Sequence, residues 1–281
     1  MKSSRYERVV TYSVLIAFTV MVLYPMLSIL FLALHKKTDL VTGFAFPIHP
    51  DLSSFTAAWT QDDGAGGPGF DKLFTNSFIV AGVVTVVSAV LSIGTGYAFG
   101  TMHFRGERVL FSIVLLGIIF PYEATVIPLY YDFQRFDLLN SYWALILPQI
   151  GQSVSFGTFW MRAFFRSSPR SLIEAARIDG ASSWEVLWRV LLPQARPAIT
   201  TMCALVFVYT WNEFLLALVL IQDPARQTAP LGLSFFAGTA RAGDPTAVAA
   251  ASVLVALPII IVYVFLQRHF IRGMLAGAIK E

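Results

Sequence analysis

Two acidic residues lie inside strongly apolar stretches of this sequence, where a carboxylate is costly and usually has a functional task. Glu123 follows Phe-Pro-Tyr in one stretch, and Glu213 follows Trp211 and Asn212 in another. A carboxylate in such surroundings can exchange a proton, or it can accept hydrogen bonds from a polar solute. The indole of Trp211 and the amide of Asn212 suit the apolar face and the hydroxyl groups of a sugar. We therefore expect these four residues to line a path for a polar solute, with buried polar ties between helices as the alternative.

The chain carries no recognisable catalytic or metal-binding motif. Its glycine-rich segment DDGAGGPG resembles a phosphate cradle only superficially, because no Gly-Lys-Ser/Thr follows it. Cys203 is the only cysteine, which excludes a disulfide within the chain and a zinc-type Cys/His cluster. We expect no catalytic residue, no metal and no cofactor, so any ATP that drives this protein must be hydrolysed by another chain.

The composition is that of a membrane protein. Hydrophobic residues make up 56% of the 281 residues and charged residues only 13%, with a mean hydropathy of +0.67. Runs of about twenty apolar residues, each long enough to cross a bilayer, recur at Val10–Leu34, Ser77–Gly100, Leu110–Tyr131, Tyr142–Phe164, Ala198–Ile221 and Ala247–Gln267. We predict an all-α membrane protein with about six transmembrane helices that form a single domain over residues 1–281.

Two features predict how these runs bend and pack. Pro121 and Pro128 are expected to break the third run near Glu123. Small residues recur at every fourth position of the second run, as Ser88, Ser92, Gly96 and Gly100. Such a stripe predicts close contact with another helix, either within this chain or in a partner subunit.

The distribution of positive charge predicts the orientation of the chain. If the N-terminus is cytoplasmic, the inner segments carry fourteen of the 20 Lys and Arg residues and the outer segments carry six. Positive charge accumulates on the cytoplasmic side of membrane proteins, so we expect both termini to be cytoplasmic. The net charge of +3 then reflects topology and gives no reason to expect nucleic-acid binding.

A charged, amphipathic segment lies between the fourth and fifth runs, on the predicted cytoplasmic side. Ser168 and Pro169 suit the start of a first helix, and Gly180 suits its end in a left-handed conformation. Ser182 and Glu185 predict a capping box at the start of a second helix. The apolar face of that second helix consists of Trp184, Leu187, Trp188 and Leu191.

Two functions of this helix pair remain open at this point. The small side chains of Ala175 and Ala176 would let another protein surface approach the first helix closely. Trp184 and Trp188 would equally suit a helix that rests on the bilayer. Pro193 is expected to end the second helix.

The segment EAARIDGASSWEVLWRVLLP resembles the signature of the membrane subunits of ATP-binding-cassette importers. In that signature Glu-Ala-Ala is followed by Gly and then by Ile-x-Leu-Pro, and this chain departs from it only by Val190 in place of Ile. The six-run plan, the segment WNEFLLAL and the closing QRHFIRGMLAGAIKE are similar to the carbohydrate-uptake branch, specifically to the second permease of maltose-type transporters. The resemblance extends over the whole chain.

The resemblance implies a permease that forms half of the translocation pathway of an ATP-driven, binding-protein-dependent importer for a sugar or a polyol. The residues that would contact the ATPase lie in a coupling loop of about residues 166–196, at Glu174, Ala175, Ala176, Gly180, Leu192 and Pro193. The implied partners are ATP-binding-cassette ATPase subunits, a second and non-identical permease, an extracytoplasmic solute-binding protein and membrane lipid.

Two alternatives accompany this interpretation. The last outer loop, about Gln222–Thr246, would either contact the binding protein or serve as a plain flexible connector. A proton-coupled secondary transporter would use Glu123 and Glu213 as protonation sites and would need no ATPase.

Overall fold

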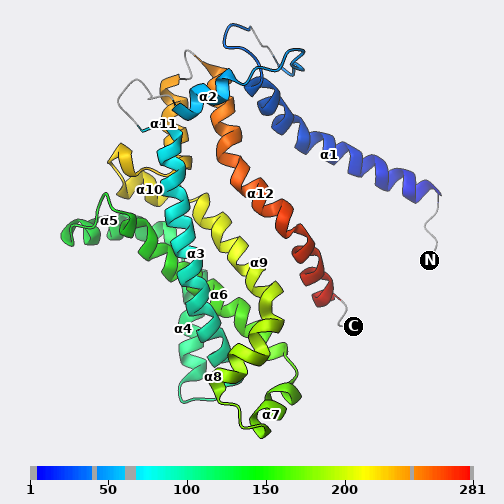
Figure 1. The fold of residues 1–281 in the computed structure, drawn as a ribbon, viewed down its shortest axis with the longest axis vertical. Helices are drawn as coiled ribbons and strands as arrows, with labels where there is room; N and C mark the ends of the chain where they lie inside the picture. The colour runs from blue at the N-terminus through cyan, green and yellow to red at the C-terminus, as the bar shows by residue number, and fades with distance from the viewer. Residues whose placement is uncertain (1–4, 40–42, 61–67, 241–243, 279–281) are drawn as a thin grey trace. The chain divides into compact units, whose positions relative to one another are not determined.

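The computed structural model describes residues 5–39, 43–60, 68–240 and 244–278, and every regular element in these ranges is a helix (Figure 1). This agrees with the predicted all-α membrane protein. The α-helices are α1 (Arg5–Ala33), α2 (Ser53–Thr60), α3 (Phe70–Thr101), α4 (Glu107–Ile119), α5 (Val126–Arg135), α6 (Tyr142–Ser167), α7 (Arg170–Ile178), α8 (Ser183–Glu185), α9 (Leu192–Trp211), α10 (Leu215–Leu220), α11 (Ala229–Ala240) and α12 (Pro245–Ala278). The 3-10 helices η1 (Tyr122–Thr125) and η3 (Pro224–Arg226) and the π-helix η2 (Val186–Leu191) lie between them.

Several of these helices are long and apolar enough to cross a membrane. Four meet both conditions: α1, α3, the Ser183–Trp211 helix that comprises α8, η2 and α9, and the Pro245–Phe265 part of α12. The pair α4 and α5 counts as a fifth only if the two helices form one bent span. Helix α6 has 26 residues, which is about 39 Å of helix. It is less apolar because it carries several glutamine and serine residues.

The third predicted run is broken, as expected, at Pro121. Helices α4 and α5 meet there at an angle of 87°, and Pro121 itself has an extended backbone. Pro128 does not break the helix, contrary to the prediction. It is the third residue of α5, in the first turn, where a backbone N–H has no partner within the helix and its loss is harmless.

The predicted stop at Pro193 is wrong. The helix continues from Ser183 to Trp211, with Pro193 as the second residue of α9. The π-helix η2 comes immediately before α9 and changes the hydrogen-bond register where the proline lacks a donor. The fifth run also ends earlier than predicted, at Trp211, and α10 follows as a separate short helix.

Contacts divide the chain into two compact units, which are residues 1–72 with 232–257 and residues 73–231 with 258–281. In the first unit the Phe70 and Phe236 rings meet edge to face, with centroids 5.4 Å apart. The Ser54 hydroxyl donates a hydrogen bond of 3.0 Å to the Thr246 hydroxyl. These contacts join α2 and the start of α3 to α11 and α12.

The predicted outer loops are only partly loops. Most of the last one is helical, because it contains η3 and α11, and residues 241–243 of it lie outside the described residues. A flexible connector over the whole of residues 222–246 is therefore wrong. The first outer loop includes α2, and the glycine-rich residues 61–67 also lie outside the described residues.

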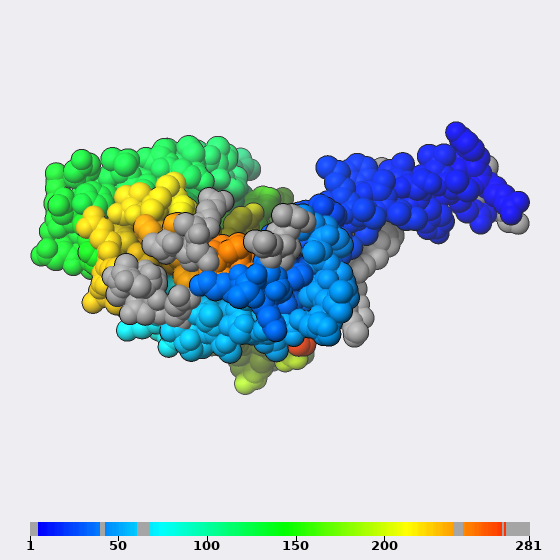
Figure 2. Space-filling view, turned by 90° about the horizontal axis from the view of Figure 1, so that it is seen from above, coloured from blue at the N-terminus to red at the C-terminus, as the bar shows by residue number. Residues whose placement is uncertain are grey.

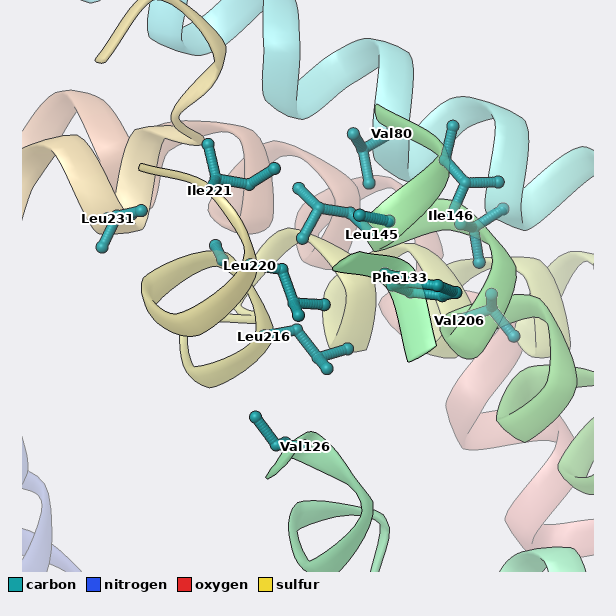
Figure 3. Close-up of a cluster of buried hydrophobic side chains, with 13 residues drawn as sticks. Val80, Val126, Phe133, Leu145, Ile146, Val206, Leu216, Leu220, Ile221 and Leu231 are labelled. Carbon is teal, nitrogen blue, oxygen red and sulfur yellow. The ribbon is translucent and has the colours of Figure 1, made fainter. Parts of the chain in front are cut away.

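The second unit is built around two clusters of buried apolar side chains. The first cluster joins α3, α5, α6, α9 and α10, and includes Val80, Phe133, Leu145, Val206 and Leu216 (Figure 3). Helices α5 and α10 lie side by side here, as the adjacent green and yellow surfaces of Figure 2 also show. This cluster holds two helix breaks in place. One lies between α4 and α5, and the other lies between α9 and α10.

The second core cluster joins α3 and α6 to the π-helix and α9, and includes Tyr97, Met161, Phe165, Leu187 and Leu191. The small-residue stripe of α3 makes close contact with α6 here. A Cβ atom added to Gly96 would lie 2.5 Å from Cβ of Met161. Of the two predicted alternatives for the stripe, the structure therefore supports packing within the chain.

Candidate functional site

A cavity of 680 Å³ lies in the second unit where α4 ends, α6 passes and α9 gives way to α10. Three of the four expected pathway residues line it, namely Glu123, Asn212 and Glu213. Asn212 and Glu213 are neighbours in the sequence, and the fold brings Glu123 of a distant segment to the same cavity. Most of the remaining wall is apolar or aromatic and includes Ile119, Phe120, Phe156, Tyr209 and Phe214.

Glu213 is positioned by the break between α9 and α10. Its carboxylate accepts hydrogen bonds from the backbone N–H groups of Leu216 at 2.8 Å and Ala217 at 3.2 Å, which belong to the first turn of α10. The Tyr122 hydroxyl donates a third bond, of 3.2 Å, from η1. These bonds cap α10 and tie the two helix breaks together. They also supply partners for a carboxylate that is only 8% exposed.

Glu123 has a different environment in the same cavity. It lies in η1, next to the bend at Pro121, and its side chain is exposed. Its backbone carbonyl accepts a bond from Val126, but no hydrogen bond or ion pair engages its carboxylate within the described part of the chain. The carboxylate of Glu123 is therefore available to bind another group.

Helix α6 contributes a polar face that sequence reasoning missed. Gln149, Gln152 and Ser153 all line the cavity, and their spacing places them on one side of the helix. Gln149 is 5% exposed and donates from Nε2 to the Leu145 carbonyl at 2.9 Å, whereas its Oε1 has no protein partner among the described residues. The recurrence of polar residues at positions i, i+3 and i+4 inside an apolar run was the signal that could have revealed this face.

Trp211 does not line the cavity, which contradicts its expected role as a stacking ring for the solute. It is 1% exposed and lies among Phe74, Phe78 and Phe207, with ring centroids 4.8–5.7 Å away. Aromatic rings in such contacts contribute to helix packing. Tyr209, two residues earlier, is 73% exposed and presents the aromatic surface that Trp211 was expected to supply.

The predicted coupling segment forms a helix, a tight turn and a second helix. Helix α7 begins at Arg170, one residue later than predicted, because Pro169 has a ψ of 122°, outside the helical region. Gly180 ends it with φ of 83°, in the left-handed region as predicted. The N–H of Ala181 donates to the Ala176 carbonyl at 2.9 Å and that of Gly180 donates to the Arg177 carbonyl at 3.0 Å. This pair of bonds is a complete Schellman motif, which fixes the direction of the chain after α7.

The second helix begins with the predicted capping box. The Ser182 hydroxyl accepts a bond from the Glu185 N–H, and the Glu185 carboxylate accepts one from the Ser182 N–H at 3.0 Å. The Tyr97 hydroxyl donates to the Ser183 carbonyl at 3.0 Å and so ties this turn to α3. The turn is therefore held by bonds on both sides.

The two faces of α7 differ in burial. Ile173 and Ala176 pack against the second core cluster, and Leu192 at the start of α9 does the same. Glu174 and Ala175 are exposed, and no residue of α7 is fully buried. The structure therefore leaves one face of α7 accessible to a partner, and holds the other against the helices that surround it.

The chain is similar to a family of transport proteins along most of its length. Residues 92–276 match the family described as the binding-protein-dependent transport system inner membrane component. The chain is 30% identical over 280 residues to the diacetylchitobiose uptake system permease protein NgcG of Streptomyces coelicolor, which covers 99% of this chain and 91% of the relative. It is 32% identical over 260 residues to the sulfoquinovosyl glycerol transport system permease protein SmoH of Agrobacterium fabrum, covering 92% and 89%.

A solved structure of a transporter also resembles this chain. A chain from the crystal structure of a bacterial ABC transporter involved in the import of the acidic polysaccharide alginate matches with a TM-score of 0.79 and 25% identity. The match covers 96% of this chain and 99% of the other. These similarities favour an ATP-driven importer over a proton-coupled secondary transporter. The chain belongs to the family of binding-protein-dependent transport system inner membrane components.

Proposed function

We propose that this chain is the permease subunit of an importer for a sugar or a related polyol, and that it forms half of the translocation pathway. Permeases named for diacetylchitobiose and for sulfoquinovosyl glycerol are among its relatives, which supports a glycoside as the solute. The chain itself catalyses no covalent step, and ATP is hydrolysed by separate ATPase subunits.

The observation that carries this proposal is that the turn after α7 and the cavity lie at opposite ends of one continuous helix. The helix Ser183–Trp211 follows directly after the turn at the end of α7, and its other end leads into the cavity through Asn212 and Glu213. Its 29 residues correspond to about 43 Å, enough to cross a bilayer. A displacement of α7 by the ATPase would therefore be transmitted to the cavity wall along one continuous helix.

The coupling residues divide by burial. Glu174 and Ala175 would contact the ATPase directly, because they lie on the accessible face of α7. Ala176 and Leu192 would support that face from the core, and Gly180 would fix the turn. Pro193, which is exposed, would lie at the edge of the contact.

The remaining partners follow from the same proposal. The chain would act as a single transmembrane domain in the cell membrane, with both termini and α7 in the cytoplasm. A second, non-identical permease would complete the pathway. An extracytoplasmic binding protein would deliver the solute, and helix α11 with the neighbouring segments would contact it.

The test is to extract the protein gently from its native membrane and to identify by mass spectrometry the proteins that copurify with it. We expect an ATP-binding-cassette ATPase and a second permease in stoichiometric amounts, and ATP hydrolysis that a binding protein stimulates. A homo-oligomer that retains no ATPase under several detergents would contradict the proposal.

A further inference from the structure

We propose that the cavity selects solutes by charge, so that it admits neutral and cationic saccharides such as amino sugars and rejects saccharides that carry a carboxylate or a sulfonate. This inference rests on the proposed function, because it assumes that the cavity is part of the translocation path. It adds a specificity that the family assignment does not contain.

The ionisable side chains that this chain places around the cavity are both acidic. Glu123 and Glu213 line it, and no Lys, Arg or His side chain does so within the part of the chain that the structure describes. Glu213 is held by three donors at the α9–α10 break, so its oxygens already have partners. Glu123 is the exposed carboxylate, and it is the group that an entering solute would meet.

The uncharged polar groups of the wall also favour a donor-rich solute. The Oε1 atom of Gln149 is available as an acceptor, and the Asn212 amide donates its own hydrogen to the Val208 carbonyl at 2.8 Å, which leaves its oxygen available. Sugar hydroxyls and ammonium groups can donate to such oxygens. An anionic group brings further acceptors and a like charge, so it would lose its water shell without gaining a partner.

The relatives indicate that the fold alone does not set this charge preference. The alginate importer moves an acidic polysaccharide, and the SmoH relative is named for a sulfonated glycoside, while NgcG is named for a neutral one. Charge preference within this family therefore depends on particular side chains and not on the fold. Glu123 is the side chain that the structure assigns to this role here.

The test measures the electrostatic potential of the cavity without knowledge of the natural solute. Ser153 lines the cavity and is replaced by cysteine in a Cys203→Ser background. The complete transporter in proteoliposomes is then treated with three methanethiosulfonates of similar size, which carry a trimethylammonium, a hydroxyl or a sulfonate group. Each rate is divided by the rate of the same reagent with a small free thiol.

We expect the cationic reagent to react at least about tenfold faster than the anionic one at Ser153→Cys, since a cleft lined by one sign of charge concentrates the opposite sign by about tenfold or more. Glu123→Gln should reduce this ratio several-fold, and Glu123→Lys should reverse it. The matched control is Thr60→Cys, which is exposed and does not line the cavity, and whose ratio should not respond to either change at Glu123.

Three results would overturn the proposal. The first is equal rates for the cationic and anionic reagents, or a ratio that does not change with Glu123→Gln. The second is import of a uronate or a sulfonated sugar by the unmodified transporter. The third is absence of reaction with the neutral reagent both at Ser153→Cys and at Gln152→Cys, which would remove the cavity from the path. Copurification of the ATPase in that case would leave the importer assignment intact.

Discussion

The hydroxyl group of Tyr122 donates a hydrogen bond of 3.2 Å to Oε1 of Glu213, and this bond joins two helix breaks that are far apart in the sequence. Tyr122 opens η1 at the bend between α4 and α5, whereas Glu213 lies between α9 and α10. The same oxygen accepts a bond from the Leu216 N–H at 2.8 Å. A movement of α9 therefore has to break the Tyr122 bond or move the bend that carries Glu123.

Removing the two partners of this bond should have unequal effects on stability. Tyr122→Phe removes one donor and leaves Glu213 with its two amide partners, so we expect a loss of about 1 kcal/mol in the free energy of unfolding. Glu213→Ala leaves the amides of Leu216 and Ala217 without an acceptor, and we expect a larger loss, up to about 3 kcal/mol. Unfolding of the purified protein in detergent measures both values.

The control for this pair is Glu213→Gln, which keeps an acceptor for the α10 amides and should lie between the other two variants. Equal losses for Tyr122→Phe and Glu213→Ala would show that Glu213 does not cap α10. Transport should fall in Tyr122→Phe and Glu213→Ala, because the bend at η1 is then no longer tied to Glu213. It should fall less in Glu213→Gln, whose amide oxygen can still accept the Tyr122 bond.

Two glycines of α3 provide a matched test of helix packing. A Cβ atom at Gly96 would lie 2.5 Å from Cβ of Met161, whereas one at Gly94 would have nothing within 4 Å. We expect Gly96→Ala to destabilise the protein by about 1–3 kcal/mol through overpacking. Gly94→Ala should be neutral or stabilising by up to about 1 kcal/mol, since alanine favours a helix over glycine.

Thermal unfolding of the two variants side by side checks this prediction. A similar melting temperature for Gly96→Ala and Gly94→Ala would mean that α3 and α6 are not in close contact at Gly96. The extent of expression in the membrane gives a second readout of the same difference.

The features of this chain that could be predicted are those whose determinants lie close together in the sequence. The capping box of Ser182 and Glu185 and the left-handed Gly180 each depend on a few consecutive residues, and both were predicted correctly. Pro193 shows the limit of the same reasoning, because its effect depends on the π-helix that precedes it. A proline alone does not reveal whether the helix before it can change register.

The features that were missed depend on distant contacts. Trp211 is buried because Phe74 and Phe78 of α3 pack on it, and nothing in the local sequence indicates that contact. Glu123 and Glu213 stand out in the sequence because a carboxylate inside an apolar run is unusual wherever it lies. Gln149 is polar but neutral, and therefore gave a weaker signal in the composition of α6.

Asp244 should make the stability of the first unit depend on acid pH. Burial raises the pKa of its carboxyl group, but hydrogen bonds from the Ala247 N–H and the Thr246 hydroxyl and the ammonium group of Lys37 at 3.4 Å outweigh it and hold the pKa below its ordinary value. A carboxyl group whose folded-state pKa is lowered contributes stability above its unfolded pKa, about 3.9, and loses that contribution as the pH falls through the lower folded value.

We therefore expect Asp244→Asn to destabilise the protein near pH 7 and to have a progressively smaller effect as the pH falls below about 4. Unfolding measured over a series of pH values, with wild type and variant in parallel, checks the sign. Lys37→Gln is the control, since it removes one of the partners and should reproduce only part of the difference. A difference that grows as the pH falls would contradict the prediction.

Gly180 links local backbone geometry to coupling with the ATPase. Its φ of 83° lies in the left-handed region, and a Cβ atom added there would have nothing within 4 Å, so a substitution would strain the backbone without a steric clash. Gly180→Ala should cost about 1–2 kcal/mol locally, enough to shift the turn after α7. Gly180→Asn should be better tolerated, because asparagine adopts this conformation more readily.

The measurement is the amount of ATPase that copurifies with each variant, together with ATP hydrolysis stimulated by the binding protein. We expect both to fall several-fold for Gly180→Ala and to be largely retained for Gly180→Asn. Because the difference between the two variants is conformational, loss of coupling in both to the same extent would point to a contact with Gly180 itself. Full coupling in Gly180→Ala would show that the orientation of α7 is not set by this turn, and the second helix would then have to position α7 through the Tyr97 bond to Ser183.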